Sequence, residues 1–254
     1  MNIHQHFILI MKNRTFYSVV ILSVVNTFCV SLAFSQPKFP KKMEGDTSGF
    51  VSIFDGKSLD GWEGDLNYWR VEDGNIIGEV TPDKLLKQNS FLIWRGGTTG
   101  NFELKLDYKV SANGNSGINY RSYEVGDIPY ALKGYQCDID GKGRWSGQNY
   151  EEKARKFLAL RGQVSEINSQ KGAFEIGSVG ERDALLQFIR KEDWNACHII
   201  VRGNIMIHKI NGQVMSIVID NDVEQRKMEG LLGVQVHVGP PMTIEYKNIR
   251  IKKF

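Results

Sequence analysis

The stretch Phe102-Glu103-Leu104-Lys105-Leu106-Asp107-Tyr108-Lys109-Val110 alternates apolar and charged residues without a break. Because successive side chains of a β-strand point to opposite faces, this pattern predicts a strand with one face in a hydrophobic core and the other in water. No sustained helical periodicity appears after the first 35 residues. The strand therefore indicates an antiparallel sheet that is packed through one of its faces.

Strong turn signals recur at short spacing on both sides of this strand. Asp73-Gly74, Gly203-Asn204 and Asn211-Gly212 each separate two short runs of strand character, which is typical of β-hairpins. About a dozen such runs predict an all-β domain of two packed antiparallel sheets. Residues 141–180 are rich in Gly, Ser, Arg and Lys and are expected to form long loops with strand fragments, and residues 182–190 a short helix.

The first 35 residues have the features of a secretory signal peptide. Lys12 and Arg14 precede an uncharged, mostly apolar run over residues 16–32, and Ala33-Phe34-Ser35 then gives the small-x-small pattern of a cleavage site. An N-terminal membrane anchor is the alternative, but the run is close to the minimum length for a span and Asn26 interrupts it. We therefore expect a periplasmic or secreted protein with no stable membrane span after processing.

After the signal peptide, residues 36–48 are predicted to be a flexible leader and residues 49–254 a single large domain. The whole chain has 32 basic and 29 acidic residues, and two of the basic ones lie in the predicted signal peptide. A nearly neutral domain gives no reason to expect nucleic acid or an anionic membrane as a partner. Cys137 and Cys197 both have apolar neighbours on their strand faces, which favours two buried free thiols over the disulfide that export would permit.

Gly134-Tyr135-Gln136-Cys137-Asp138-Ile139-Asp140 predicts a strand with an unusual polar face. It places Gln136, Asp138 and Asp140 on one side and apolar residues on the other. Two further segments have similar stripes. Asn115, Asn119 and Arg121 line one of them, and Gln235 and His237 line the other, where a strand over residues 231–238 is expected.

If the three strands lie in one curved sheet, its polar face combines amides, carboxylates, a guanidinium and an imidazole. These groups can hold sugar hydroxyls and move protons, and Tyr123 and Trp145 could stack on sugar rings. A sheet can also simply show water one polar face, which is the simpler explanation for any single stripe. Three stripes that bring Asp138, Arg121 and His237 to one face favour a sugar-binding site. Asp140 either binds the sugar there or only forms a turn.

Other short motifs are absent from the sequence. It has no His-Glu-x-x-His, no pair of Cys-x-x-Cys motifs, no phosphate loop and no Gly-x-Ser-x-Gly. We therefore expect no cofactor, and a divalent metal held by Asp138 and His237 stays open as an alternative.

Ordered blocks of specific sequence run through residues 49–254. The N-terminal blocks are Phe54-Asp55-Gly56-Lys57-Ser58-Leu59-Asp60-Gly61-Trp62, Gly114-Asn115-Ser116-Gly117-Ile118 and Gly134-Tyr135-Gln136; the C-terminal ones are Asp193-Trp194-Asn195, Gly239-Pro240-Pro241 and Asn248-Ile249. Together these blocks resemble the 3-keto-disaccharide hydrolase domain family. The chain is similar to the tyrosine-glutamine subgroup at Tyr135-Gln136.

The resemblance implies a concanavalin-like jelly roll, export, and action on glycosides oxidised at C3, with an oligosaccharide or glycoside as substrate. Such a ketone acidifies the C2 proton, so a base can remove it while the C1 substituent leaves. We assign Asp138 as base, His237 as base or acid and Arg121 to the enolate. Hydroxyl binding falls to Asn115, Gln136, Asp140 and Gln235. The alternative is a glycan-binding module that uses the same face without catalysis.

Overall fold

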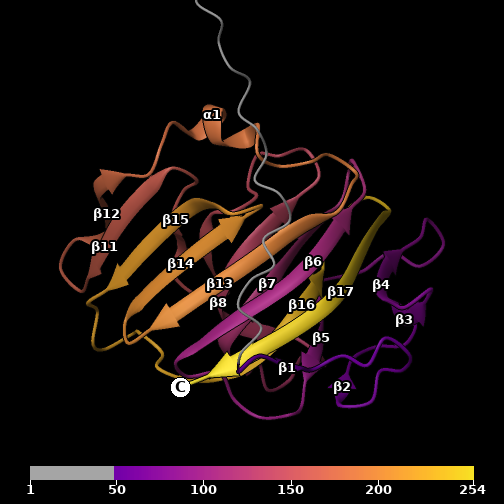
Figure 1. Ribbon diagram of the computed structural model, residues 1–254. Coiled ribbons are helices and arrows are strands. Elements are labelled where there is room, and N and C mark those ends of the chain that lie inside the picture. Colours follow the sequence, from indigo (N-terminus) through magenta and orange to yellow (C-terminus); the bar gives the residue numbers. More distant parts are fainter. Residues whose placement is uncertain (1–48) are drawn as a thin grey trace, which may run out of the picture. The chain divides into compact units, whose positions relative to one another are not determined.

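The computed structural model describes residues 49–254, and this part of the chain forms two packed β-sheets with one short helix, α1 (Arg182–Leu186). Figure 1 shows the broad strands of one sheet in front of the other, with α1 at one end. The predicted signal peptide and leader, residues 1–35 and 36–48, lie outside the described residues. Among residues 49–254 no helix is long and apolar enough to cross a bilayer.

The first sheet, which we call the large sheet, has ten strands within residues 49–254. From edge to edge it contains β12 (Gly172–Ser178), β11 (Gln163–Asn168), β15 (Gln213–Asp220), β14 (Ile205–Ile210), β13 (Asn195–Arg202), β6 (Phe102–Val110), β17 (Met242–Lys253), β4 (Asn75–Val80) and β3 (Trp69–Glu72), with β1 (Val51–Ser52) beside β17. All of its pairings are antiparallel except β11 with β15, which is parallel.

The second sheet, which we call the small sheet, has seven strands within the same residues. In order it contains β10 (Lys156–Ala159), β9 (Asn149–Glu152), β8 (Leu132–Asp140), β7 (Asn115–Glu124), β16 (Leu231–Val236), β5 (Ser90–Trp94) and β2 (Trp62–Glu63). Its pairings are all antiparallel. The predicted all-β, two-sheet jelly-roll sandwich is therefore confirmed, with one parallel pair that the turn pattern did not show.

The three predicted hairpins are present. Asp73 and Gly74, with φ of 49° and 77°, turn β3 into β4, and Asn211 and Gly212, with φ of 51° and 85°, turn β14 into β15. Gly203 has φ of 54° between β13 and β14. Positive φ strains most side chains but is tolerated by Gly and Asn, so these residues fix the register of the strands that they join.

Over residues 141–180 the expected strand fragments are present, as β10 and β12, but the expectation of long loops around them is wrong. Four strands, β9 to β12, occupy most of this segment and extend both sheets at the same side. β10 and β12 are the outermost strands, and such strands bury less apolar surface than central ones and tolerate charged side chains, so their sequences lack a clear alternating pattern. The predicted helix over residues 182–190 is shortened to α1.

The core lies between the sheets and takes the apolar side of each alternating strand. Leu104, Leu106 and Tyr108 of β6 are buried there, as are Tyr135, Cys137 and Ile139 of β8. Cys137 and Cys197 are both buried free thiols, as expected. Because β8 gives its odd-numbered residues to the core, its even-numbered residues must face away from the large sheet.

Candidate functional site

Gln136, Asp138 and Asp140 lie on the outer face of the small sheet, as the alternation predicted. The side chains are nevertheless buried, with 3%, 8% and 4% of their surface exposed. Asn119 of β7 pairs with Gln136 on one side and with Gly233 of β16 on the other. Amide side chains of neighbouring strands therefore lie beside the Asp138 carboxyl group on the outer face of the small sheet.

Asp138 is held by two glutamine side chains. Gln136 Nε2 donates to Asp138 Oδ1 at 2.5 Å, and Gln148 Nε2 donates to Oδ2. Gln235 Nε2 in turn donates to Gln136 Oε1 at 3.1 Å. We call Asn119, Gln136, Asp138, Gln148 and Gln235 the polar layer. Each of its members comes from a strand of the small sheet or, for Gln148, from the residue just before β9.

The environment of Asp138 favours its neutral form. Burial raises its pKa to about 7, while the hydrogen bonds from Gln136 and Gln148 act in the opposite direction. The negative charges of Glu152 and Asp140 raise it further. A carboxyl group that changes protonation near neutral pH can act as a general base or acid.

Three oxygen atoms of the polar layer are buried without a hydrogen-bond partner. They are Asn119 Oδ1, Gln148 Oε1 and Gln235 Oε1. Leaving a buried polar atom unpaired costs about 1–3 kcal/mol, so native proteins usually satisfy such atoms. Amide oxygens accept hydrogen bonds from hydroxyl groups, so the layer is suited to a ligand rich in hydroxyls.

A second carboxyl group, Glu152, borders the polar layer at the end of β9. Burial raises its pKa, while the hydrogen bond from Asn89 and the charges of Lys153 and His237 lower it. Asn89 Nδ2 donates to Glu152 Oε1 at 3.2 Å, and Asn89 Oδ1 accepts from Val238 N at 3.0 Å. His237 follows the end of β16, which is shorter than predicted, and its charge acts on the pKa of Glu152.

Tyr150 completes this group. It lies opposite Gln136 in the pairing of β8 with β9. Burial raises the pKa of its hydroxyl, and the charges of Glu152 and Asp138 add to the shift. The sequence reasoning missed Gln148, Tyr150 and Glu152, although their spacing by two residues is itself a strand stripe.

The polar layer is fixed from behind by a hydrogen-bonded histidine in the core. The hydroxyl of Tyr120 in the small sheet lies 2.8 Å from His208 Nε2 in the large sheet, and His208 Nδ1 lies 3.2 Å from the carbonyl oxygen of Gln148. Burial lowers the pKa of His208 to about 4, so the ring is neutral and donates through Nδ1 to that carbonyl. This contact holds the backbone of Gln148, whose side chain holds Asp138.

Arg121 does not join the site, and the prediction that it shares a hollow with Asp138 is wrong. A bulge interrupts β7 between Tyr120 and Tyr123, and Arg121 has φ of 46°. Its buried guanidinium donates to the carbonyl oxygens of Gly100 and Gly203, at 3.0 and 2.7 Å. Gly203 lies in the turn between β13 and β14 of the large sheet, so the bulge has turned the side chain to the other face of β7.

Tyr123 is also misplaced by the bulge. It pairs with Lys133, which alternates with Leu132 and Gly134, so it lies on the opposite face of the small sheet from Asp138. The ammonium groups of Lys133 and Lys227 lie 5.8 and 5.7 Å from its ring. Tyr123 therefore offers no platform beside the polar layer.

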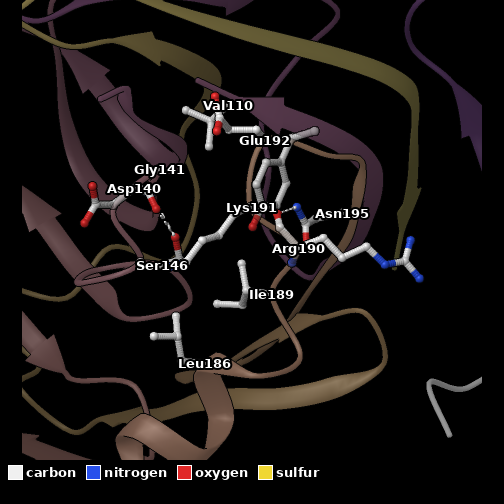
Figure 2. A pocket seen from close by; sticks show the side chains of 12 residues that line it. Val110, Asp140, Gly141, Ser146, Leu186, Ile189, Arg190, Lys191, Glu192 and Asn195 are labelled. Carbon is white, nitrogen blue, oxygen red and sulfur yellow. Dashed lines mark hydrogen bonds between the residues drawn. The ribbon is translucent and has the colours of Figure 1, made fainter. Parts of the chain in front are cut away.

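Asp140 is a turn former. Its Oδ1 and Oδ2 accept the backbone N–H groups of Lys142 and Arg144, at 3.1 and 2.8 Å, and Asn115 lies opposite it in β7. The small cavity beside Asp140, about 10 Å³, has room for one water molecule at most. In Figure 2 the Asp140 carboxylate points away from this cavity. The binding role predicted for Asp140 therefore has no geometric support.

Trp145 lies at the β10 edge of the small sheet, where its ring packs 5.5 Å from the ring of Phe157. Within residues 49–254 no three His, Cys, Asp or Glu side chains are grouped to hold a metal ion. The site that the structure assembles is therefore the polar layer with Glu152, His237 and Tyr150 at its border.

Comparisons with known proteins relate the whole described domain to carbohydrate-active proteins. A family model described as the 3-keto-alpha-glucoside-1,2-lyase-like domain matches residues 49–252. The chain is 38% identical over 87 residues to a 3-keto-disaccharide hydrolase of Bacteroides thetaiotaomicron. That stretch covers 32% of this chain and 30% of the relative, so the chain matches less than a third of the relative's length.

Two solved structures share the fold. A candidate glycosyl hydrolase from Parabacteroides distasonis has 20% identity and a TM-score of 0.55, and the match covers 81% of this chain and 94% of that one. A carbohydrate-binding module from Bacillus subtilis, CBM66, has 12% identity and a TM-score of 0.50 over 76% of this chain and 96% of that one. At these identities the likeness concerns the fold alone.

We expect Arg121→Met to destabilise the domain rather than alter its chemistry. The substitution leaves buried carbonyl oxygens without their charged donor, which costs roughly 2–4 kcal/mol of unfolding free energy. Urea unfolding followed by tryptophan fluorescence measures this loss. Arg70→Met is the matched control, because its pairs with Glu72 and Glu79 are exposed and should contribute less than about 1 kcal/mol. Equal stability of the two variants would contradict the placement of Arg121.

We expect Asp138→Asn to change how stability depends on pH. The folded pKa of Asp138 lies above its ordinary value of 3.8, so burial of the carboxylate costs stability progressively as the pH rises from about 4 to about 7. The asparagine variant lacks this cost. The unfolding free energy of the wild type should therefore fall relative to the variant by about 1 kcal/mol per pH unit over that range. Parallel curves would mean that Asp138 is not buried as a titrating group.

Proposed function

Because the chain belongs to the 3-keto-alpha-glucoside-1,2-lyase-like domain family, we propose that it cleaves glycosides oxidised at C3. The observation that supports this most strongly is the polar layer, in which a buried carboxyl group is surrounded by unpaired amide oxygens. In this proposal these oxygens accept the sugar hydroxyls beside Asp138. The name of the Bacteroides thetaiotaomicron relative, a 3-keto-disaccharide hydrolase, agrees with this substrate class.

In the proposed reaction Asp138 removes the proton on C2 of the 3-keto sugar. The electron pair of that C–H bond forms a C1=C2 double bond, and the C1–O bond breaks with its electrons on the leaving oxygen. The products are an unsaturated 3-keto sugar and the free alcohol, and addition of water at C1 then gives net hydrolysis. A base with a pKa near 7 is matched to this proton transfer at neutral pH.

Two further groups serve the reaction in this proposal. Glu152, which burial favours in its protonated form, gives a proton to the leaving oxygen, and His237 adjusts its acidity. Tyr150 takes the role first assigned to Arg121 and donates its hydroxyl to the enolate oxygen at C3. This role is supported by the position of Tyr150 opposite Gln136 and by the effect of the Asp138 and Glu152 charges on the pKa of its hydroxyl.

Localisation belongs to the same proposal. The chain is exported through its N-terminal 35 residues and acts in the periplasm or outside the cell. N-terminal sequencing of the protein recovered from the producing cells tests this, with Gln36 expected as the first residue and an uncleaved Met1 contradicting it.

The chemistry is tested by incubating the protein with a 3-keto-glucoside and following release of the alcohol. We expect Asp138→Asn to lower kcat/KM by about a hundredfold or more, because it removes the base. Asp60→Asn, an exposed carboxylate in a turn, is the matched control and should change little. Deuterium at C2 should give a primary isotope effect well above one. An isotope effect of one, together with full activity of Asp138→Asn, would overturn the assignment.

The alternative function is a glycan-binding module, which the fold shared with CBM66 favours. It uses the same polar layer but needs no base. Binding of oligosaccharides without any alcohol release from the 3-keto-glucoside, and with binding retained in Asp138→Asn, would favour this alternative.

A further inference from the structure

A groove of about 450 Å³ opens where β10 of the small sheet approaches the β11–β12 hairpin. In Figure 1 β11 and β12 form one edge of the molecule. The volume lies in the range of sites for small ligands, about 300–1,000 Å³. Its lining includes the rings of Trp145, Phe157 and Phe174 and the side chains of Gln163, Glu175 and Arg182.

A row of aromatic rings leads from the polar layer into this groove. Phe157 pairs with Tyr150 across β9 and β10, so both lie on the outer face of the small sheet. Their ring centroids are 5.2 Å apart, and the centroid of Trp145 lies 5.5 Å from that of Phe157. Phe157 is 45% exposed although it is large and apolar. A molecule that reaches Asp138 beside Tyr150 can therefore extend along this row.

Two of the polar side chains of the groove, Gln163 and Arg182, already hydrogen-bond within the protein. Gln163 Nε2 donates to Glu175 Oε2, and Gln163 Oε1 accepts from Leu160 N, both at 2.8 Å. Arg182 donates to the carbonyl oxygen of Arg144 at 2.7 Å, and the guanidinium groups of both arginines lie within 5.7 Å of the Trp145 ring centre. A second sugar ring would need free donors and acceptors, whereas a flat apolar ring needs only the aromatic surface.

We propose that this groove holds a flat aromatic aglycone, stacked on Phe157 and Trp145, while the sugar of the same glycoside lies over the polar layer. The inference rests on the proposed function for its choice of a glycoside. It also specifies the substrate class, because an aromatic groove makes aryl glycosides the preferred ligands. The leaving group then lies away from the amides of the polar layer. Tyr150 then lies at the junction of sugar and aglycone.

Binding of unoxidised phenyl and methyl β-D-glucoside, measured by isothermal titration, tests this without any turnover. Phenyl glucoside should bind about fivefold to tenfold more tightly, the effect of one or two aromatic contacts. Phe157→Ala should remove this preference while leaving methyl glucoside affinity unchanged, and Trp145→Ala should act in the same direction. Phe254→Ala, an exposed phenylalanine at the C-terminus, is the matched control and should keep the preference.

Equal affinities for the two glucosides, or no measurable binding of phenyl glucoside, would overturn the assignment of the groove. So would a preference that survives Phe157→Ala and Trp145→Ala together. Because the probes carry no ketone, failure of cleavage and failure of aryl binding are separate results. If the protein prefers the phenyl glucoside but releases no alcohol from a 3-keto-glucoside, the assignment of the groove stands and only the proposed reaction is wrong.

Discussion

Burial of one carboxyl group organises this site. Asp138 lies on a sheet face that would otherwise meet water, yet only 8% of its surface is exposed. A buried carboxylate is costly unless it is hydrogen-bonded, and the amides of Gln136 and Gln148 provide that support. The support is partial, because the pKa of Asp138 still rises to about 7. The Asp138 carboxyl group is therefore held in place by hydrogen bonds and can still exchange a proton near neutral pH.

The two sheets contribute differently to this arrangement. The small sheet carries the polar layer, whereas the large sheet supplies His208, which fixes the backbone of Gln148 from behind. Cys137 of the small sheet meets Cys197 of the large sheet in the core. Close packing of these interior groups leaves the polar layer little freedom to move, which suits a site that must hold a sugar in one orientation.

Strand alternation predicted much of the fold and part of the site. The stripe of Gln136 and Asp138, the hairpin turns and the buried thiols follow from local pattern alone. The positions of Arg121 and Tyr123 could not be predicted in this way. A one-residue bulge reverses every face assignment after it, and no residue pattern in the sequence signals it. Glu152 was missed because it lies in residues 141–180, whose content of Gly, Ser, Arg and Lys predicted loops, and because its partner Asn89 is distant in the sequence.

The most direct test of this account is the pKa of Asp138 itself. The carboxyl ¹³C shift of Asp138, followed by NMR from pH 3 to 9 and identified by its loss in Asp138→Asn, reports that value without substrate. The account predicts a midpoint near 7. A midpoint near the ordinary aspartate value of about 4 would contradict it, since a solvated carboxylate could not be the buried base on which the site depends.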